Sequence, residues 1–315
     1  MAEEMTVEYV HQHEKAKTGC GEDLSACRSF EDVLRVTGTD WNVSKEPVFL
    51  ADGSEIPNSY AIVRDIDGKV LSKQTVSKQF VPFQNREFMD LGQGLIDMGI
   101  RPNRGGAYFG GAKTWYSFDM GDTDILGDPH HQYIILSNAH DGSGSVTVAV
   151  ALVRIVCSNQ MSFALHSAPF KWAFIHKTGV NDKISEAADA VLRGREYVAQ
   201  YIQEMQTMQS EKVGRSDIMD FLDAVVPYPK QVNDVIKKNI DEKREQILHI
   251  YDFKPDLSLL GDTKYHLLSA VSDFVSHPKE RKTPKAQAAA LERANDRLMT
   301  GDPMLQRAYR LLAAV

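Results

Sequence analysis

The residues that suggest chemistry in this sequence are lysines and arginines interleaved with aromatic rings between positions 78 and 172. Phosphates are bound by positive charge and unpaired bases stack on flat rings, so this pattern is typical of a surface for single-stranded nucleic acid. One ring contributes about 1–3 kcal/mol by stacking on a base. The candidate nucleic-acid-binding residues are Lys78, Phe80, Arg101, Arg104, Lys113, Trp115, Tyr116, Arg154 and Lys171.

A second interpretation competes for the aromatic members of this set. Aromatic residues in strands mostly fill the core, and this applies to Phe80 and Trp115 as well. Arg154 does not fit a core, because it interrupts the apolar run VTVAVALVRIVC and an unpaired buried charge is costly. Arg154 must therefore face solvent, a partner or a ligand.

Segments of this chain that resemble nucleotide-binding or metal-binding motifs lack residues that those motifs require. The segment GGAYFGGAKT resembles a P-loop, but alanines occupy both glycine positions and the strand-like WYSF follows where a helix is required. LGQGLID carries Asp97 in place of the third glycine of a dinucleotide motif. His11, His13, Cys20 and Cys27 match no common zinc spacing. We therefore predict no cofactor and no metal.

The sequence assigns no catalytic group. His140 and Asp141 stand beside Ser143, but neighbours in one turn do not face each other as base and orienter of a hydrolytic triad. We predict no classical catalytic site. An enzyme with unrecognised chemistry stays open as an alternative, in which His130 and His131 would converge with these residues in one pocket.

The charge of the chain restricts where a nucleic acid could bind. The net charge is −7, which at first argues against such a partner. Residues 1–150 carry 22 acids and 13 bases, whereas residues 151–315 carry 21 acids and 23 bases. Because the local field decides where a polyanion binds, the acid excess of the first half limits the site without excluding it.

The cellular compartment of the protein can be predicted from targeting and membrane features that the sequence lacks. No run of 18 apolar residues is present, the first residues have no hydrophobic segment typical of a secretory signal, and three cysteines suit a reducing environment. These features predict a cytoplasmic protein without a membrane partner.

The first half has the pattern of an antiparallel sheet. Asp52-Gly53 and Asp67-Gly68 are hairpin signals between strand-forming residues, and Gly110-Gly111 and the Asp-Gly-Ser-Gly stretch from residue 141 separate further strands. Ser29 is a candidate N-cap for the short helix FEDVLRV. A second helix, REFMDLGQGLIDMG, is inserted between the strands, of which we expect about seven, KWAFIHKT being the last.

After residue 181 the hydrophobic period changes from two to about 3.6, which predicts helices. A long helix over 183–210 places Val191, Val198 and Met205 on one face, and further helices are expected at 215–226, 230–250, 263–276, 285–299 and 303–313. The chain is thus predicted to be α+β, with an antiparallel β-sheet domain, an inserted helix, a long helix and a C-terminal helical domain. The expected divisions are a flexible arm (1–28), a β-rich core (29–180) and a helical part (181–315).

Several blocks of the sequence resemble a known family. Asn42-Val43 and residues 76–85, 133–145, 153–165, 261–277 and 302–312 are similar to the phage/plasmid-like proteins of unknown function, VRIVCSNQ being the most specific block. This resemblance implies a bacterial host cell. At the level of fold, the strand–helix pattern is also similar to the phage single-strand annealing proteins.

The annealing resemblance implies a function. It points to ATP-independent binding and annealing of single-stranded DNA in recombination or replication, by a homo-oligomeric ring or filament, with a phage exonuclease as a further partner. The heptad-bearing helix is then a candidate subunit contact. The alternative is a phage-encoded protein-interaction or host-takeover factor without nucleic-acid activity.

Overall fold

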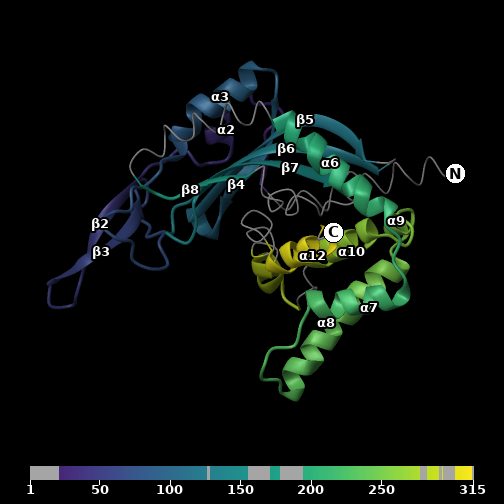
Figure 1. Cartoon of the computed structure of the whole chain (residues 1–315). Coiled ribbons are helices and arrows are strands. Elements are labelled where there is room, and N and C mark those ends of the chain that lie inside the picture. The colour runs from purple at the N-terminus through teal and green to yellow at the C-terminus, as the bar shows by residue number, and fades with distance from the viewer. Residues whose placement is uncertain are drawn as a thin grey trace. The chain divides into compact units, whose positions relative to one another are not determined.

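The strands of the first half form a six-stranded antiparallel sheet in the computed structural model, which describes residues 21–125, 128–154, 171–177, 194–276, 282–290, 293 and 302–313. The strand order is β1-β4-β5-β6-β7-β8. Their bounds are Glu22–Asp23 (β1), Arg101–Tyr108 (β4), Lys113–Ile125 (β5), Asp128–Ala139 (β6), Val146–Arg154 (β7) and Lys171–Phe174 (β8). From β4 onward, neighbours in the sheet are neighbours in sequence (Figure 1). The predicted α+β class is confirmed.

A separate two-stranded hairpin extends away from this sheet (Figure 1). It consists of β2 (Val43–Phe49) and β3 (Glu55–Arg64), joined by the predicted Asp52-Gly53 turn, in which Gly53 has a φ of 84°. The second predicted turn also forms, with Gly68 at a φ of 66°. The residues after it form two isolated bridges with β3, Val63–Val70 and Tyr60–Val76, in place of the strand expected there.

Two helices pack on the larger sheet. α2 (Phe30–Val36) is the predicted FEDVLRV, and the Ser29 hydroxyl accepts a hydrogen bond from the Asp32 N–H at 3.1 Å, as an N-cap should. The inserted helix consists of the 3-10 turn η1 (Asn85–Phe88) and α3 (Met89–Asp97). Phe30 reaches the sheet at Tyr116, with ring centroids 5.3 Å apart in an edge-to-face arrangement. These large rings form the centre of the core.

Two glycines of α3 give a matched test of this packing. A Cβ on Gly92 would lie 2.2 Å from a ring carbon of Phe30, whereas a Cβ on Gly94 would meet nothing within 4 Å. We expect Gly92→Ala to destabilise the protein by about 1–3 kcal/mol through overpacking. Gly94→Ala should instead stabilise it by about 0.5–1 kcal/mol, since alanine restricts the unfolded chain. Urea unfolding of both variants measures the difference, and equal effects would contradict the packing of α2 on α3.

The predicted N-terminal arm is wrong for its last residues. Residues 1–20 lie outside the described residues, but Glu22 and Asp23 form strand β1, paired with Gly105 and Arg104 of β4. Leu24 is fully buried. A two-residue strand is too short to produce a hydrophobic period, so the sequence pattern could not reveal it.

The second half is helical, as predicted. The helices are α6 (Gly194–Ser210), α7 (Arg215–Val225), α8 (Asp234–Phe253), α9 (Pro255–Ser258), α10 (Lys264–Ser276) and α12 (Pro303–Ala313). The described part of the long helix, α6, buries Tyr201, Met205 and Met208, spaced four and three residues apart. The earlier part predicted for this helix, 183–193, lies outside the described residues.

The described residues group into two compact units. One contains residues 21–121, 132–150 and 171–177, and the other contains the ends of β5, β6 and β7 with the helices from residue 195 on. The predicted division at residue 180 falls outside the described residues. Within the described part of the chain, no helix is both long and apolar enough to cross a membrane.

Candidate nucleic-acid interface

A small hydrophobic core lies under the β2–β3 hairpin and gives the candidate site its base. It consists of Trp41, Val43, Ile62, Leu71, Val76 and Ala112, all buried. The rings of Tyr60, Phe80 and Phe109 pack against this core while remaining only partly buried. Three aromatic rings from separate segments are thereby held around one centre.

The pairing of β2 with β3 puts charged and aromatic residues on one face. Lys45 lies opposite Ile62, and Pro47 lies opposite Tyr60, so their side chains share a side of the hairpin. Lys45 Nζ donates to the carbonyls of Lys78 and Phe80 at 2.7 and 3.0 Å and lies 4.9 Å from the centroid of the Tyr60 ring.

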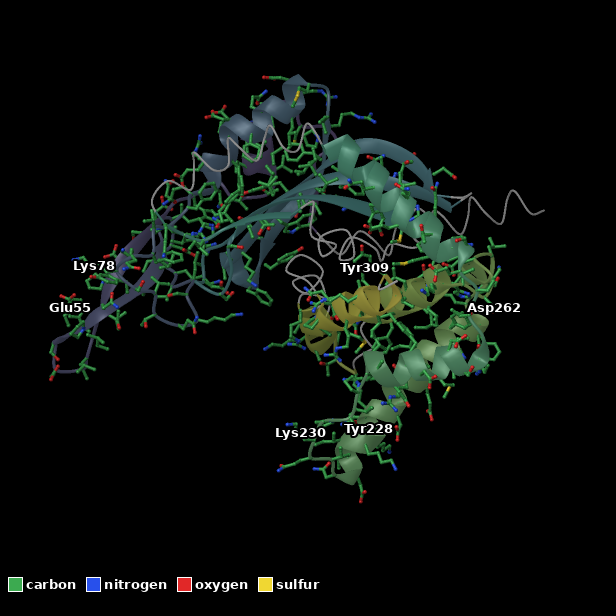
Figure 2. The ribbon with its side chains drawn as sticks, viewed as in Figure 1. Glu55, Lys78, Tyr228, Lys230, Asp262 and Tyr309 are labelled. Atoms are coloured by element: carbon green, nitrogen blue, oxygen red, sulfur yellow. The ribbon has the colours of Figure 1, made fainter. Side chains whose placement is uncertain are left out.

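The segment that carries Lys78 is fixed against the same hairpin. The Lys78 N–H donates to Asn58 Oδ1 at 2.8 Å, and the Lys78 side chain is exposed. Figure 2 shows Lys78 beside the outer part of the hairpin. Phe80, two residues on, stacks on His176 with ring centroids 4.5 Å apart. The ring of Phe80 is therefore anchored, and Lys78 extends to solvent from an anchored segment.

A tight turn between β4 and β5 brings further cations to this core. Phe109 has a φ of 51°, an uncommon value for a residue with a side chain, and Gly110 and Gly111 follow at 67° and 103°. The Gly110 carbonyl accepts from Lys69 Nζ at 3.0 Å and from Arg64 Nη1 at 3.4 Å. A Cβ on Gly110 would lie 2.1 Å from Lys69 Nζ, so glycine is required for this approach.

Two lysines flank the ring that this turn presents. Lys73 Nζ lies 4.2 Å from the centroid of the Phe109 ring, and Lys113 Nζ lies 5.8 Å from it. A ring attracts an ammonium group through its quadrupole but carries no charge to neutralise it. We call the whole set the lysine–aromatic cluster; its members are Lys45, Lys69, Lys73, Lys78, Lys113, Tyr60, Phe80 and Phe109.

The charge of this cluster is largely uncompensated. In the described part of the chain, Lys45, Lys69, Lys73 and Lys78 form no ion pair with a carboxylate. Asp67 is bound instead by Arg64, at 2.9 and 2.5 Å, and this hydrogen bonding lowers the pKa of Asp67 to about 2. The nearby acid is therefore hydrogen-bonded to the arginine, and the Lys69 side chain acts on it through its electrostatic field.

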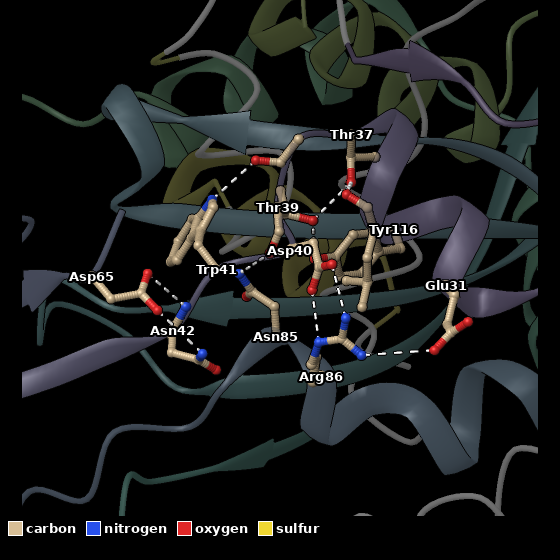
Figure 3. Close-up of polar contacts among 12 residues, drawn as sticks. Glu31, Thr37, Thr39, Asp40, Trp41, Asn42, Asp65, Asn85, Arg86 and Tyr116 are labelled. Carbon is tan, nitrogen blue, oxygen red and sulfur yellow. Dashed lines mark hydrogen bonds and ion pairs between the residues drawn. The ribbon is translucent and has the colours of Figure 1, made fainter. Parts of the chain in front are cut away.

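Polar contacts fix the base of the hairpin on the sheet unit (Figure 3). Asn42 donates from its backbone and side chain to the Asp65 carboxylate at 3.1 and 3.2 Å, which closes the hairpin next to Arg64. Arg86 of η1 binds Asp40 through two nitrogens, at 2.7 and 2.8 Å. These contacts tie the strands of the hairpin to the inserted helix.

A buried amide connects that helix to the sheet. Asn85, which is fully buried, donates to the Thr39 carbonyl at 2.9 Å and accepts from Thr114 Oγ1 at 2.8 Å. Its Oδ1 also lies 3.0 Å from His140 Nε2. The Thr39 hydroxyl in turn lies 2.7 Å from the Tyr116 hydroxyl. Each of these groups has a structural partner, as buried polar groups require.

The histidines do not converge in one pocket among the described residues. His130 lies 3.1 Å from the Tyr265 hydroxyl in the helical unit, and His131 pairs with Asp122. Asp141 Oδ1 accepts from the Ser143 N–H and hydroxyl, a contact within one turn. No group of three or more metal-binding side chains is found in the described ranges. This geometry gives no support to the enzyme alternative.

The structure brings three of the predicted site residues into the lysine–aromatic cluster: Lys78, Phe80 and Lys113. Arg101 is exposed at the opposite end of β4 from the Gly110 turn, roughly 20 Å away at 3.3 Å per residue. Arg104 lies in the middle of β4, where its guanidinium reaches the Gly21 carbonyl at 3.4 Å. These two arginines are not part of the cluster.

The predicted stacking roles of Trp115 and Tyr116 are wrong. Trp115 is 3% exposed and Tyr116 is 0% exposed, so neither presents a face to a base. Trp115 stacks on Tyr108, and Tyr116 packs under Phe30, so both are core residues; the competing interpretation had predicted this for Trp115. Arg154 and Lys171 lie on β7 and β8, and their side chains lie outside what the structure describes.

The sequence reasoning missed most of the cluster. Lys45, Lys69 and Lys73 stand outside any aromatic-rich segment, and Phe109 belongs to the aromatic and basic pattern but was not one of the candidate residues. They meet because two turns fold back on the same small core, a long-range arrangement that spacing does not encode. The only local signal was the Gly110-Gly111 pair, which marks a turn able to accept close approach by side chains.

The fold and this surface together define an α+β protein with a cationic, ring-lined face on its sheet unit. The chain belongs to an uncharacterised family, because the family model described as "Domain of unknown function (DUF932)" matches residues 73–296. Four of the six similar blocks lie within the match. No curated protein and no solved structure matches the chain.

Proposed function

We propose that this protein binds single-stranded nucleic acid, DNA in the first instance, and promotes annealing of complementary strands without nucleotide hydrolysis. The proposed setting is phage-type recombination or replication, with the protein acting as a homo-oligomer. The proposal draws on the sequence resemblance to annealing proteins and on the lysine–aromatic cluster.

The charge of the cluster supports the phosphate part of this proposal. Lys45, Lys69, Lys73 and Lys78 form no carboxylate pair in the described part of the chain; Lys45 lies on β2, and the other three are spread along the segment between β3 and η1. Positive groups spread over a surface can follow a flexible backbone, which a single clustered charge cannot do. Such contacts release counterions, so binding would weaken steeply with salt.

The aromatic rings of the cluster support the proposal that the bound nucleic acid is single-stranded. Tyr60, Phe80 and Phe109 are partly buried, which holds them rigidly while leaving part of each ring accessible. Unpaired bases offer a face to such rings, whereas bases in a duplex are already stacked. The observation that carries the proposal is that Lys73 Nζ and Lys113 Nζ both lie over the partly buried Phe109 ring, 4.2 and 5.8 Å from its centroid.

Binding to a labelled oligonucleotide tests the proposal. We expect fluorescence anisotropy with a 40-nucleotide single strand to give a dissociation constant in the micromolar range or below at about 50 mM salt, and weaker binding to the matching duplex. Annealing of two complementary strands should be accelerated without ATP. Absence of single-strand affinity at this salt concentration would disprove the proposed function.

A further inference from the structure

The tip of the β2–β3 hairpin exposes apolar side chains inside an acidic segment. Phe49 and Leu50 are 54% and 55% exposed. Residues 46–55 carry three carboxylates, Glu46, Asp52 and Glu55, and no base. All three are exposed, and Figure 2 shows Glu55 near the end of the hairpin. Large exposed apolar residues grouped in this way are typical of contact surfaces.

The start of α8 has the complementary character. Val232 and Val235 are 44% and 68% exposed and flank Asn233, the N-cap of the helix, whose side chain accepts from the Ile236 N–H at 2.8 Å. Residues 228–239 carry three lysines and one acid: Lys230, Lys237, Lys238 and Asp234. The three lysines are exposed and form no ion pair among the described residues. This surface is apolar and bordered by the three lysines, of which Lys237 and Lys238 also line a hollow with Asp241, Glu242 and Glu245 further along α8.

We propose that these two surfaces bind each other between copies of the chain, so that the hairpin tip of one copy docks on the start of α8 of the next. The two patches differ, so the contact is heterologous, and repetition of it gives a ring or an open filament. Apolar burial of Phe49 and Leu50 drives the association, and the opposite charges of the rims set the orientation.

Charge favours this surface over a second exposed apolar patch of the helical unit, at Phe253 and Leu259. Phe253 and Leu259 are 69% and 87% exposed, more than the valines of α8. Residues 252–262, however, carry three aspartates and one lysine, which would repel the acidic hairpin tip. Like charges placed against each other across an interface cost several kcal/mol. The Leu259 patch therefore serves as an internal control.

The inference does not depend on nucleic-acid binding, so it is tested on the protein alone. Sedimentation equilibrium of the full chain at about 50 mM salt should show a mass that rises with concentration and falls at high salt. The double variants Glu46→Lys/Glu55→Lys and Lys237→Glu/Lys238→Glu should each raise the dissociation constant for self-association at least tenfold. Leu259→Ser should leave it unchanged.

The decisive experiment is to mix the two charge-reversed proteins. Each variant alone has like charges at its contact, but in the mixture both contacts between unlike variants pair opposite charges, so the two proteins should assemble together in alternation. Formation of this mixed assembly also shows that both variants are folded. A wild-type monomer at all concentrations, or self-association unaffected by the charge reversals, would overturn the inference.

Discussion

Replacement of Lys73 and Lys113 by glutamine is expected to weaken single-strand binding by roughly 10- to 100-fold at about 50 mM salt. Both ammonium groups lie over the Phe109 ring, at 4.2 and 5.8 Å from its centroid. Each phosphate contact contributes about 0.7 to the salt slope for a single strand, so the double variant should lower that slope by about 1.4. Anisotropy titrations over a range of salt concentrations measure both quantities.

A charge-matched control separates a local contact from the overall field. Lys282 and Lys285 are exposed in the helical unit, and Lys282→Gln/Lys285→Gln removes the same charge from the protein. We expect this control to change the affinity by less than about threefold and to leave the salt slope unaltered. Equal losses in the two double variants would mean that the cluster has no special role.

Acidification is expected to destabilise the sheet unit through two buried histidines. His140 is 1% exposed, and burial lowers its pKa to about 3, with His176 as a secondary cause. His176 is 4% exposed, and burial lowers its pKa to about 4 against the opposing effect of the Val81 and Ala139 carbonyls. Both therefore stay neutral in the folded protein at pH 5–6, while in the unfolded chain they take up protons below about 6.5.

The direction in which the free energy of unfolding changes with pH follows from this difference in proton binding. The unfolded state binds more protons below pH 6.5, so the free energy of unfolding falls as the pH decreases from about 7 toward 4. The loss is about 1 kcal/mol per histidine per pH unit, which gives about 2–3 kcal/mol at pH 5.5 for the pair. Urea unfolding at pH 7.5 and 5.5 measures it.

His176→Phe isolates one of the two contributions. His176 is 4% exposed and its ring stacks on Phe80, so an apolar ring suits the site. We expect the variant to lose about half of the histidine-dependent decrease between pH 7.5 and 5.5. His249→Gln, at an exposed position, should keep the full decrease. If the His176→Phe variant also kept the full decrease in the free energy of unfolding, His176 would not be the neutral buried group described above.

Local signals were sufficient to predict most elements of the fold. Asp52-Gly53 predicted the β2–β3 hairpin because that dipeptide suits a tight turn, and Ser29 predicted the start of α2 because its hydroxyl can cap the first turn. Pro227, Pro255 and Pro303 marked boundaries of the later helices, since proline fits poorly inside them. These features depend only on residues close in sequence.

The site was less accessible to prediction, for physical reasons. Alternation along β5 cannot distinguish a solvent-facing ring from a buried one when both faces of the strand are covered, as they are at Trp115 and Tyr116. Lys69 and Lys73 join the cluster because the turn at Phe109 adopts positive φ angles and presents the Gly110 carbonyl. No rule based on residue spacing predicts that these lysines and this turn come together.

One sequence block has a structural explanation in the helical unit. Asp262 of the GDTKYH segment accepts from the Tyr251 hydroxyl at 3.1 Å, and its carbonyl accepts from the Val213 N–H at 3.1 Å. Lys264 pairs with Glu211, and Thr263 donates to Gln209 at 3.0 Å. The segment therefore joins the end of α6 to the start of α10, which gives these residues a packing role in this structure.

Photocrosslinking of a bound single strand tests the central claim most directly. An oligonucleotide containing 5-iodouracil is irradiated with the wild-type protein at low salt, and the crosslinked peptides are identified by mass spectrometry. The proposed function predicts crosslinks at the aromatic members of the cluster, Tyr60, Phe80 or Phe109, and their loss at high salt. Crosslinks confined to the helices after residue 195 would contradict it.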